Sequence, residues 1–411
     1  MSDLEFRSVT DAEWPEFLET LRMAFGALPA PGDEAIEKRP WAIERSMAAL
    51  EDGHPVGCAG SYDFDLTLPG LTTAPAAGVT WVGVRPTHRR QGALTGIMRA
   101  QLEEIHDRGV PLAILLASES VLYGRYGYGM ATTQVDLEID RTRAVLAEPF
   151  EAPGRVVLVT DQPAIDRLLP EIHESVRRRQ HGDVSRPAEW WKPFFAGGRG
   201  GTEFGPRFHA FYENPSGETE GYAYYRLASD FSVRLRQDWT VLLQGLGALT
   251  FEAYVALWRF VWDLDLTAKL VATFRPPDEP LRHLLRDPRR LATTRSVDFL
   301  WCRLVDVPAA LSARRYEVTS SVVIEVRDPV CPWNAGRWRL DGSADGATCV
   351  RTDAAADLTM TATELGAVFL GGTHLSALAA ARRIDEHATG AVARTDSMLS
   401  TARAPWCQTF F

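Results

Sequence analysis

One stretch of the chain, residues 78–117, most limits what it can fold into. Residues 78–84 read as a strand, and residues 112–117 form the short continuous apolar run of a strand buried on both faces. Between them, residues 91–108 carry apolar side chains at helical spacing, and Gly109 stands where a helix is expected to end. A strand, a helix and another strand in so short a stretch imply a crossover between two parallel strands. The sequence therefore predicts an α/β sheet here.

The rest of the chain shows two further stretches with their own strand and helix patterns. A chain of 411 residues, 45% of them hydrophobic, exceeds what one compact core usually holds. We therefore predict three domains, at residues 1–145, 146–295 and 296–411.

The second and third stretches differ in their patterns. The second repeats the broad layout of the first, but no Gly-rich turn precedes its aromatic helix at residues 251–262. Its strands are expected at residues 156–159, 221–227, 231–235 and 267–274, with a helix at 163–180. The third stretch, with a strand at 322–326 and a helix at 365–370, predicts a compact α+β module.

Charge and hydropathy indicate the class of partner. The net charge is −10, from 54 acidic and 44 basic residues, so a nucleic acid is a poor partner and a cationic amine is a favourable one. No apolar run approaches the roughly 20 residues that cross a bilayer, and the acidic start is unlike a signal peptide. We expect a cytoplasmic protein without membrane insertion.

The cysteines and histidines give no sign of a metal site or a disulfide framework. The five cysteines are scattered and never spaced as CxxC, so reduced thiols are expected. His54, His88 and His106 have no recognisable metal or catalytic-triad spacing. We expect no metal, and a hydrolase is disfavoured.

The turn between the first strand and its helix has the features of an anion site. The backbone N–H groups of residues 90–95 would converge at the helix N-terminus, where a phosphate is favoured. Gly92 allows close approach of the backbone, and Arg89 and Arg90 supply charge-assisted hydrogen bonds. Neither a Walker lysine nor GxGxxG is present, so a pyrophosphate cradle of another kind is predicted. The alternative is a basic, solvated helix start.

Two motifs resemble a known superfamily. Residues 82–92 read Val-x-Val-x-Pro-x-x-Arg-Arg-x-Gly, which resembles the acetyl-CoA signature of GCN5-related N-acetyltransferases (GNAT), and residues 117–129 resemble its tyrosine segment. The whole chain is similar to the Eis (enhanced intracellular survival) family of aminoglycoside and lysine acetyltransferases, including residues 308–311, 352–356 and a C-terminal phenylalanine. One departure is Leu94, where the superfamily pattern prefers Gly or Ala.

The resemblance implies a fold and an assembly. We expect an α/β (α+β) chain with a GNAT domain that binds acetyl-CoA, a second GNAT-like domain without cofactor, and a C-terminal domain resembling sterol carrier proteins. The family also implies a homohexamer.

The resemblance also assigns cofactor contacts. The backbone of the strand would pair with the pantetheine arm, and the helix start would bind the pyrophosphate. Ser118 and Glu119 follow the next parallel strand, at the edge where ligands of open sheets gather. The expected acetyl-CoA contacts are Val82, Gly83, Val84, Arg89, Arg90, Gln91, Gly92, Ala93, Leu94, Thr95, Ser118 and Glu119.

Two catalytic residues follow from the same resemblance. Tyr123 matches the family's proton donor, with Tyr126 and Tyr128 as competitors; alternatively the three rings only pack the loop. The family's base is the chain's own terminal carboxylate, here that of Phe411, which at a pKa of about 3.5 is ionised at neutral pH. The alternative for Phe411 is a frayed terminus.

For the acceptor amine, the N-terminal region offers aromatic and acidic side chains. Phe25, Trp41 and Trp81 are aromatic candidates, and Asp33 and Glu34 are available to ammonium groups. Each could equally be core or surface.

Three functions remain open on the sequence alone. The first is an acetyl-CoA-dependent N-acetyltransferase acting on amines of aminoglycosides, polyamines or lysine side chains. The second is a lipid- or protein-binding module with an idle acetyltransferase site. The third is an acyltransferase that uses a longer acyl-CoA.

Overall fold

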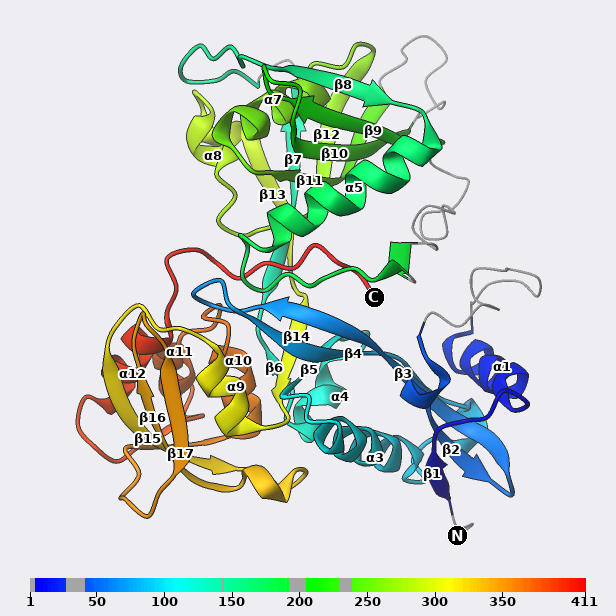
Figure 1. The fold of residues 1–411 in the computed structure, drawn as a ribbon, viewed down its shortest axis with the longest axis vertical. Coiled ribbons are helices and arrows are strands. Elements are labelled where there is room, and N and C mark those ends of the chain that lie inside the picture. Colours follow the sequence, from blue (N-terminus) through cyan, green and yellow to red (C-terminus); the bar gives the residue numbers. More distant parts are fainter. Residues whose placement is uncertain (1–3, 27–40, 142–143, 189, 192–204, 229–238) are drawn as a thin grey trace.

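The chain forms three lobes, each built on its own sheet (Figure 1). The computed structural model describes residues 4–26, 41–141, 144–188, 190–191, 205–228 and 239–411. Within those ranges, no helix combines the length and the apolar character that crossing a membrane requires.

The first sheet has seven strands and a helix on each face. In spatial order the strands are β1 (Glu5–Arg7), β2 (Met47–Glu51), β3 (His54–Thr67), β4 (Thr73–Val84), β5 (Leu112–Leu116), β14 (Leu300–Leu304) and β6 (Gly129–Met130). Helix α1 (Trp14–Phe25) packs in one hydrophobic cluster with Ala48, Leu50 and Cys58, whereas α3 (Ala93–Asp107) packs in others with alternate residues of the same strands. The short helices α4 (Ser120–Tyr123) and η3 (Gly124–Tyr126) follow β5.

The second sheet repeats this arrangement. Its strands are β8 (Arg155–Val159), β9 (Phe208–Glu213), β10 (Thr219–Ala228), β11 (Trp239–Ala248), β12 (Thr267–Arg275), β7 (Thr133–Asp140) and β13 (Leu291–Asp298). Helices α5 (Gln162–Arg177) and α7 (Phe251–Trp262) contribute to separate clusters that hold alternate residues of β9 and β10, and α8 (Leu281–Leu284) follows β12. Helix α7 connects β11 to β12 just as α3 connects β4 to β5.

The two sheets exchange one strand each. β7 enters the second sheet between β12 and β13, and β14 enters the first between β5 and β6. The domain boundaries predicted at residues 145 and 295 stay predictions. The strands of the first two sheets, however, are not divided at these two residues. β7 precedes residue 145 and lies in the second sheet, and β14 follows residue 295 and lies in the first.

The exchange has a local cause. Only Ala131 and Thr132 separate β6 from β7, and only Phe299 separates β13 from β14, so neither segment reverses into a hairpin. Both continue straight into the neighbouring sheet and pair with each other along their length, from Cys302 opposite Gly129 to Leu291 opposite Ile139. This antiparallel pair joins the first two lobes.

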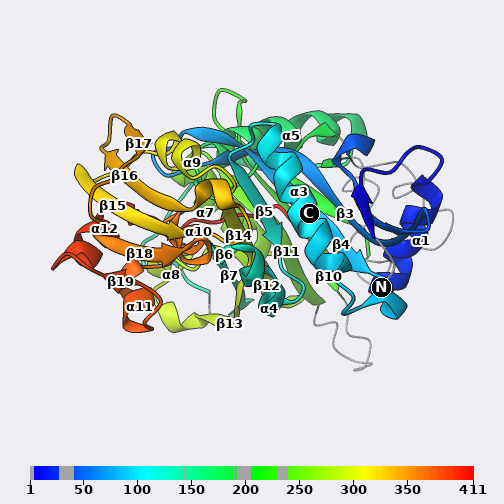
Figure 2. The ribbon, with the colours of Figure 1, turned by 90° about the horizontal axis from the view of Figure 1, so that it is seen from below.

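The third lobe has a five-stranded sheet. In order its strands are β17 (Ala347–Arg351), β16 (Gly336–Gly342), β15 (Ser320–Arg327), β18 (Leu358–Thr361) and β19 (Asp385–Glu386). Its helices are α9 (Val307–Ala313), α10 (Ala362–Val368), α11 (Leu375–Ala380) and α12 (Ala391–Leu399). α10 starts with a capping box between Thr361 and Glu364. It packs against β14 and β6 of the first sheet, as the view from below also shows (Figure 2).

The last residues cross back between the first two lobes (Figure 1). Residues 401–411 have no regular secondary structure, yet Trp406, Cys407, Thr409 and Phe411 are buried. The frayed terminus considered above is therefore not what the chain forms.

Most elements predicted from the sequence are present. The strands at 78–84, 112–117, 156–159, 221–227, 267–274 and 322–326 and the helices at 91–108, 163–180, 251–262 and 365–370 correspond to β4, β5, β8, β10, β12, β15, α3, α5, α7 and α10. The strand predicted at residues 231–235 lies outside the described residues.

Candidate functional site

Strand β4 separates from β5 at a bulge. The parallel pairing ends at Val79 opposite Leu115, while β4 continues to Val84. Opposite β3, the register slips between Cys58 and Gly60, where Trp81 adopts a left-handed backbone with φ of 57°. A β-bulge bends its strand, and a non-glycine residue at positive φ is strained. The result is a split between β4 and β5, at which the predicted contacts Val82, Gly83 and Val84 are only partly buried.

The turn after β4 has the backbone geometry that the predicted anion cradle requires. Arg90 and Gly92 both have a left-handed backbone, with φ of 63° and 94°, and Gly92 is the N-cap of α3. The first N–H groups of a helix have no partner within it, and alternating left-handed residues turn such groups to one side. No described residue lies within 4 Å of where a Gly92 side chain would begin, so the helix start faces open space.

The side chains of the cradle divide into exposed and packed ones. Those of Arg89, Arg90, Gln91 and Thr95 are exposed at the helix start. Ala93 is buried under the helix and Leu94 is half-buried, so these two can contribute only backbone groups at the surface.

Hydrogen bonds hold this turn in place. Arg85 donates from Nε to the Thr20 hydroxyl of α1 at 3.0 Å, and His88 Nε2 lies 2.9 Å from Glu51 of β2. Gln91 donates its amide to the Thr87 carbonyl at 3.1 Å, which closes the turn on itself. These contacts tie the turn to α1 and β2.

Tyr123 lies at the end of α4, on the α3 face of the sheet. It is 7% exposed and belongs to a cluster with Val79 and Leu115, the last paired residues before the split. Burial raises the pKa of the Tyr123 hydroxyl to about 12, and the nearby Glu119 carboxylate adds to the rise. The phenol therefore holds its proton at neutral pH.

The two competing tyrosines have other positions. The Tyr126 hydroxyl lies 3.3 Å from the Thr95 hydroxyl and so ties the loop to the start of α3. Tyr128 is fully buried, burial raises its pKa strongly, and its hydroxyl has no hydrogen-bond partner among the described residues. The Tyr126 hydroxyl therefore contacts α3, and the Tyr128 hydroxyl is enclosed.

Helix α10 of the third lobe packs against the loop that carries Tyr123, Tyr126 and Tyr128. Thr363 of α10 donates its hydroxyl to the Gly124 carbonyl at 2.9 Å. A side chain at Gly129 would meet the backbone of Thr363 and Ala367 at 2.1 and 2.2 Å, so only glycine fits between the loop and α10.

The ring of Phe411 lies on the opposite face of the same sheet. It contacts the Phe64 ring edge-on at 5.0 Å between centroids, and a side chain at Gly78 of β4 would come within 3.3 Å of it. An aromatic row of Trp81, Trp41, Tyr62, Phe64 and Phe411 connects this ring to the bulge, with adjacent centroids 4.5, 5.5, 5.3 and 5.0 Å apart.

The structure thus places the two predicted catalytic residues on opposite faces of one strand pair. Tyr123 clusters with Ala77, Val79 and α3, whereas Phe411 belongs to the cluster of Ala76, Ile114 and α1. The split between β4 and β5 begins directly after Val79 and Leu115, next to both of these clusters.

The remaining predicted residues are scattered around this split. Ser118 and Glu119 are exposed beyond the end of β5. Phe25 is 44% exposed and lies over Gly83, while Trp41 is 6% exposed and fills the space above Gly60. Asp33 and Glu34 lie outside the described residues.

Comparison with known proteins decides the family. Residues 5–131 and 182–304 each match an acetyltransferase (GNAT) domain, and residues 307–408 match a sterol carrier protein domain. An uncharacterized N-acetyltransferase of Streptomyces avermitilis is 40% identical over 98% of both chains, and the N-acetyltransferase Eis of Mycobacterium tuberculosis is 33% identical over 96% of both. The chain belongs to the Eis family.

Solved structures agree with this assignment. Eis1 of Mycobacterium abscessus superimposes with a TM-score of 0.89, at 34% identity over 99% of this chain and 100% of that one. A GCN5-related N-acetyltransferase of Anabaena variabilis, 17% identical, shares the fold over the full length of both chains with a TM-score of 0.86. The predicted fold, tandem GNAT domains followed by a sterol-carrier-like domain, is confirmed, and this Eis-family protein is an N-acetyltransferase.

Sequence reasoning missed three features around the site. The bulge at Trp81 and the exchange of β7 with β14 have no motif, because both depend on pairing with distant strands. The third is Asp183, a fully buried carboxylate beside the C-terminal residues. Its acidic side chain in a polar stretch carries no signal of burial.

Proposed function

We propose that this protein transfers the acetyl group of acetyl-CoA to amines of aminoglycosides, polyamines or lysine side chains. The observation that carries the proposal is the split between β4 and β5, with Tyr123 on one face of the strand pair and Phe411 on the other. In open α/β sheets, ligands gather beyond the carboxyl ends of parallel strands.

The residues of the split fit an acyl-CoA. The half-exposed backbone at Val82, Gly83 and Val84 can pair with the amide groups of a pantetheine arm as an added strand would. The exposed N–H groups at Gly92 and the side chains of Arg89 and Arg90 can hold the pyrophosphate. The bound cosubstrate would supply the thioester.

The chain's own groups then move the protons. The Phe411 carboxylate is the proposed base, which takes a proton from the amine as its nitrogen bonds to the acetyl carbon. The Tyr123 phenol is the proposed acid, which hydrogen-bonds and protonates the sulfur as the carbon–sulfur bond breaks. Burial raises the pKa of Tyr123 to about 12, and a thiolate is a weaker base than a phenolate, so the proposed role of Tyr123 is to donate a hydrogen bond to the sulfur and to shuttle a proton to it.

The acceptor class is supported by charge and by the aromatic row. The net charge of −10 attracts polycations, and the exposed ring of Phe25 and the partly buried ring of Trp81 can contact ammonium groups, whereas Trp41 is buried in the core. A cytoplasmic homohexamer is part of the proposal, supported by the family resemblance; light scattering on the purified protein tests the assembly.

The test is CoA release from acetyl-CoA with a panel of aminoglycosides, polyamines and lysine peptides. The native chain is compared with one extended by a few residues beyond Phe411, which moves the carboxylate and leaves the cradle unchanged. We expect turnover by the native chain and loss of turnover, with acetyl-CoA binding retained, in the extended one. If neither chain releases CoA, the binding-module function replaces the proposal, and faster release from longer acyl donors would indicate a different acyltransferase.

A further inference from the structure

The carboxylate of Asp183 lies buried between the first two lobes and the C-terminal residues. It accepts hydrogen bonds from the Gln408 backbone at 3.3 Å, the Gln408 amide at 3.1 Å and the Thr409 hydroxyl at 3.3 Å, besides the Val184 backbone at 3.0 Å. Burial raises the pKa of Asp183, and the Arg186 guanidinium opposes this rise. These contacts satisfy the carboxylate almost entirely with the residues that precede Phe411.

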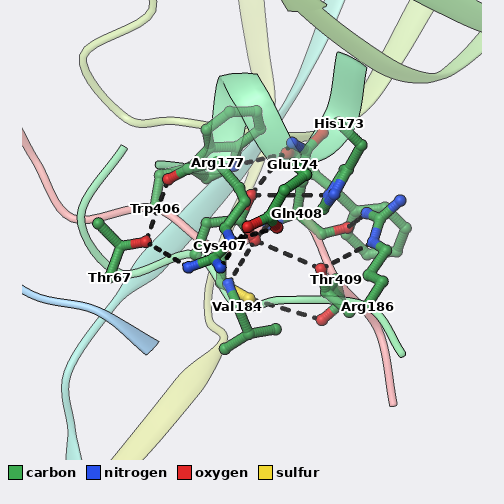
Figure 3. A network of polar contacts seen from close by, with 12 residues as sticks. Thr67, His173, Glu174, Arg177, Val184, Arg186, Trp406, Cys407, Gln408 and Thr409 are labelled. Carbon is green, nitrogen blue, oxygen red and sulfur yellow. Dashed lines mark hydrogen bonds and ion pairs between the residues drawn. The ribbon is translucent and has the colours of Figure 1, made fainter. Parts of the chain in front are cut away.

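Arg186 holds the same residues from the other side. It donates from Nε to the Thr409 hydroxyl at 3.0 Å and from Nη2 to the Gln408 carbonyl at 3.3 Å. Its guanidinium also stacks on the rings of Trp190 and Trp191, at 4.3 and 5.0 Å from their centroids. The Thr409 hydroxyl therefore accepts from Arg186 and donates to Asp183, as Figure 3 shows for the labelled Arg186 and Thr409.

Asp183 and its neighbours are hydrogen-bonded directly to the first sheet, which contains the split between β4 and β5. The Asp183 carbonyl accepts the Thr67 N–H at 2.9 Å, and Ser185 donates its N–H to Asp65 at 2.9 Å, so residues 182–185 extend along the end of β3. β3 is the neighbour of β4. From the second lobe, the Tyr222 hydroxyl donates to Gln408 Oε1 at 2.9 Å.

Beyond Thr409 the chain has little freedom. Trp190 donates its indole N–H to the Phe410 carbonyl at 3.0 Å, and the Phe411 ring is buried against Phe64. The last residues of most chains are poorly ordered unless other groups tie them down. Here a buried charged group holds Gln408 and Thr409, and the Phe411 ring anchors the last residue.

We propose that Asp183, Arg186 and Thr409 act as a clamp of positioning residues that fixes the Phe411 carboxylate at the split between β4 and β5. This inference rests on the proposed function, in which that carboxylate is the base. A base displaced by about 1 Å can lose about 100-fold in rate, so the clamp contributes through geometry and not through contact with the substrate.

The first experiment replaces Thr409 by valine, which keeps the shape and removes the hydroxyl between Asp183 and Arg186. We expect kcat to fall by about 10- to 100-fold with the KM for acetyl-CoA unchanged, because the cradle is untouched. Thr409→Ser restores the hydroxyl and is expected to recover kcat. The matched control is Thr395→Val, since Thr395 is fully buried and its hydroxyl has no hydrogen-bond partner among the described residues.

A second experiment separates positioning from general stability. In the chain extended beyond Phe411, the carboxylate is already displaced, so Thr409→Val is expected to add no further loss of kcat. Losses that multiply in the double variant would overturn the clamp, as would a Thr409→Val variant with the kcat of the native chain.

The failures of the two proposals can be told apart. An extended chain as active as the native one overturns the base, and the clamp with it; an inactive extended chain beside a fully active Thr409→Val variant overturns the clamp alone. Should Thr409→Val fail to fold, Trp190→Phe removes the indole donor to the Phe410 carbonyl and keeps an aromatic ring beside the Arg186 guanidinium. It is expected to lower kcat by a few-fold and leave the melting temperature unchanged; an unchanged kcat counts against the clamp.

Discussion

The first two lobes contain the same split, and only one of them leaves it open. β4 runs on from Thr80 to Val84 after its last pair with β5, and β11 runs on from Gln244 to Ala248 after its last pair with β12. Both strands have a bulge close to that point. Equivalent backbone geometry therefore arises twice in one chain.

The second split is filled by side chains. Arg275 at the end of β12 donates from Nη1 to the Leu246 carbonyl of β11 at 2.9 Å, and its Nε lies 2.7 Å from the buried Glu279 carboxylate. The guanidinium also lies over Trp258, at 5.4 Å, and over Trp406 of the C-terminal segment, at 4.9 Å. The C-terminal segment thus covers the second split with Trp406 before it reaches the first with Phe411.

The N-termini of the helices that follow the two splits, α3 and α7, also differ in how open they are to an anion. α3 begins at Gly92 without a side-chain cap and next to exposed arginines. α7 begins directly after β11 at Thr250, which accepts the Ala253 N–H at 3.3 Å and donates to Glu220 at 2.9 Å, with Glu252 in the first turn. A capped helix start surrounded by carboxylates disfavours a phosphate. The comparison shows that the fold alone does not make a cofactor site.

The largest expected effect tests the first split. Tyr123→Phe removes the proposed acid and should lower kcat by about 10²- to 10⁴-fold while acetyl-CoA binding stays unchanged. Steady-state kinetics and calorimetric titration with acetyl-CoA measure the two quantities. The control is Tyr128→Phe, which removes a buried hydroxyl that has no partner among the described residues and should retain kcat. Equal turnover of Tyr123→Phe and the native enzyme would remove Tyr123 from the acid role.

The next effect tests what fills the second split. Arg275→Met leaves the buried Glu279 without its ion partner and should lower the free energy of unfolding by about 3–5 kcal/mol. Arg275→Met/Glu279→Gln should recover a large part of that loss in urea titrations, because no uncompensated charge remains. In both variants we expect one acetyl-CoA per chain, since the start of α7 is still capped. Binding of two acetyl-CoA molecules per chain would show that Arg275 alone prevents the second lobe from binding acetyl-CoA.

A smaller effect tests the cradle. Arg90→Ala should weaken acetyl-CoA binding by about 10- to 100-fold, as expected for the loss of a charge-assisted hydrogen bond to a phosphate. The affected constant is the dissociation constant from titration, with kcat at saturation largely retained. Arg178→Ala, at the exposed C-cap of α5, is the charge control and should bind normally. Unchanged affinity in Arg90→Ala would mean that the pyrophosphate binds elsewhere.

The smallest effect tests the capped helix start. Thr250→Ala removes the N-cap of α7 and should lower the free energy of unfolding by about 1 kcal/mol. Thermal melts monitor this change, and kcat should remain that of the native protein. A drop in kcat without a change in stability would contradict the assignment of a purely structural role to this helix start.

Local pattern was enough for β4, α3 and β5 of the first lobe and for the turn in which the cradle is predicted. Gly92, Arg89 and Arg90 lie next to one another in sequence, and a strand followed by a turn and a helix brings their groups together without help from distant residues. Tyr123 was predicted from the resemblance of residues 117–129 to the GNAT tyrosine segment, and its role stays a prediction.

Long-range pairing decided the rest. The exchange of β7 and β14, the bulge at Trp81 and the filling of the second split by Arg275 each depend on residues that meet only after the sheets have formed. The same holds for the clamp: Asp183 and Thr409 are separated by most of the second and third lobes in sequence, and only the packing of the C-terminal segment between two sheets brings them into contact. The sequence by itself predicted candidate residues for binding and transferring an acetyl group, because these lie in short local motifs. The tertiary structure decided which split is filled by side chains and where the Phe411 ring lies, because both depend on contacts between distant segments.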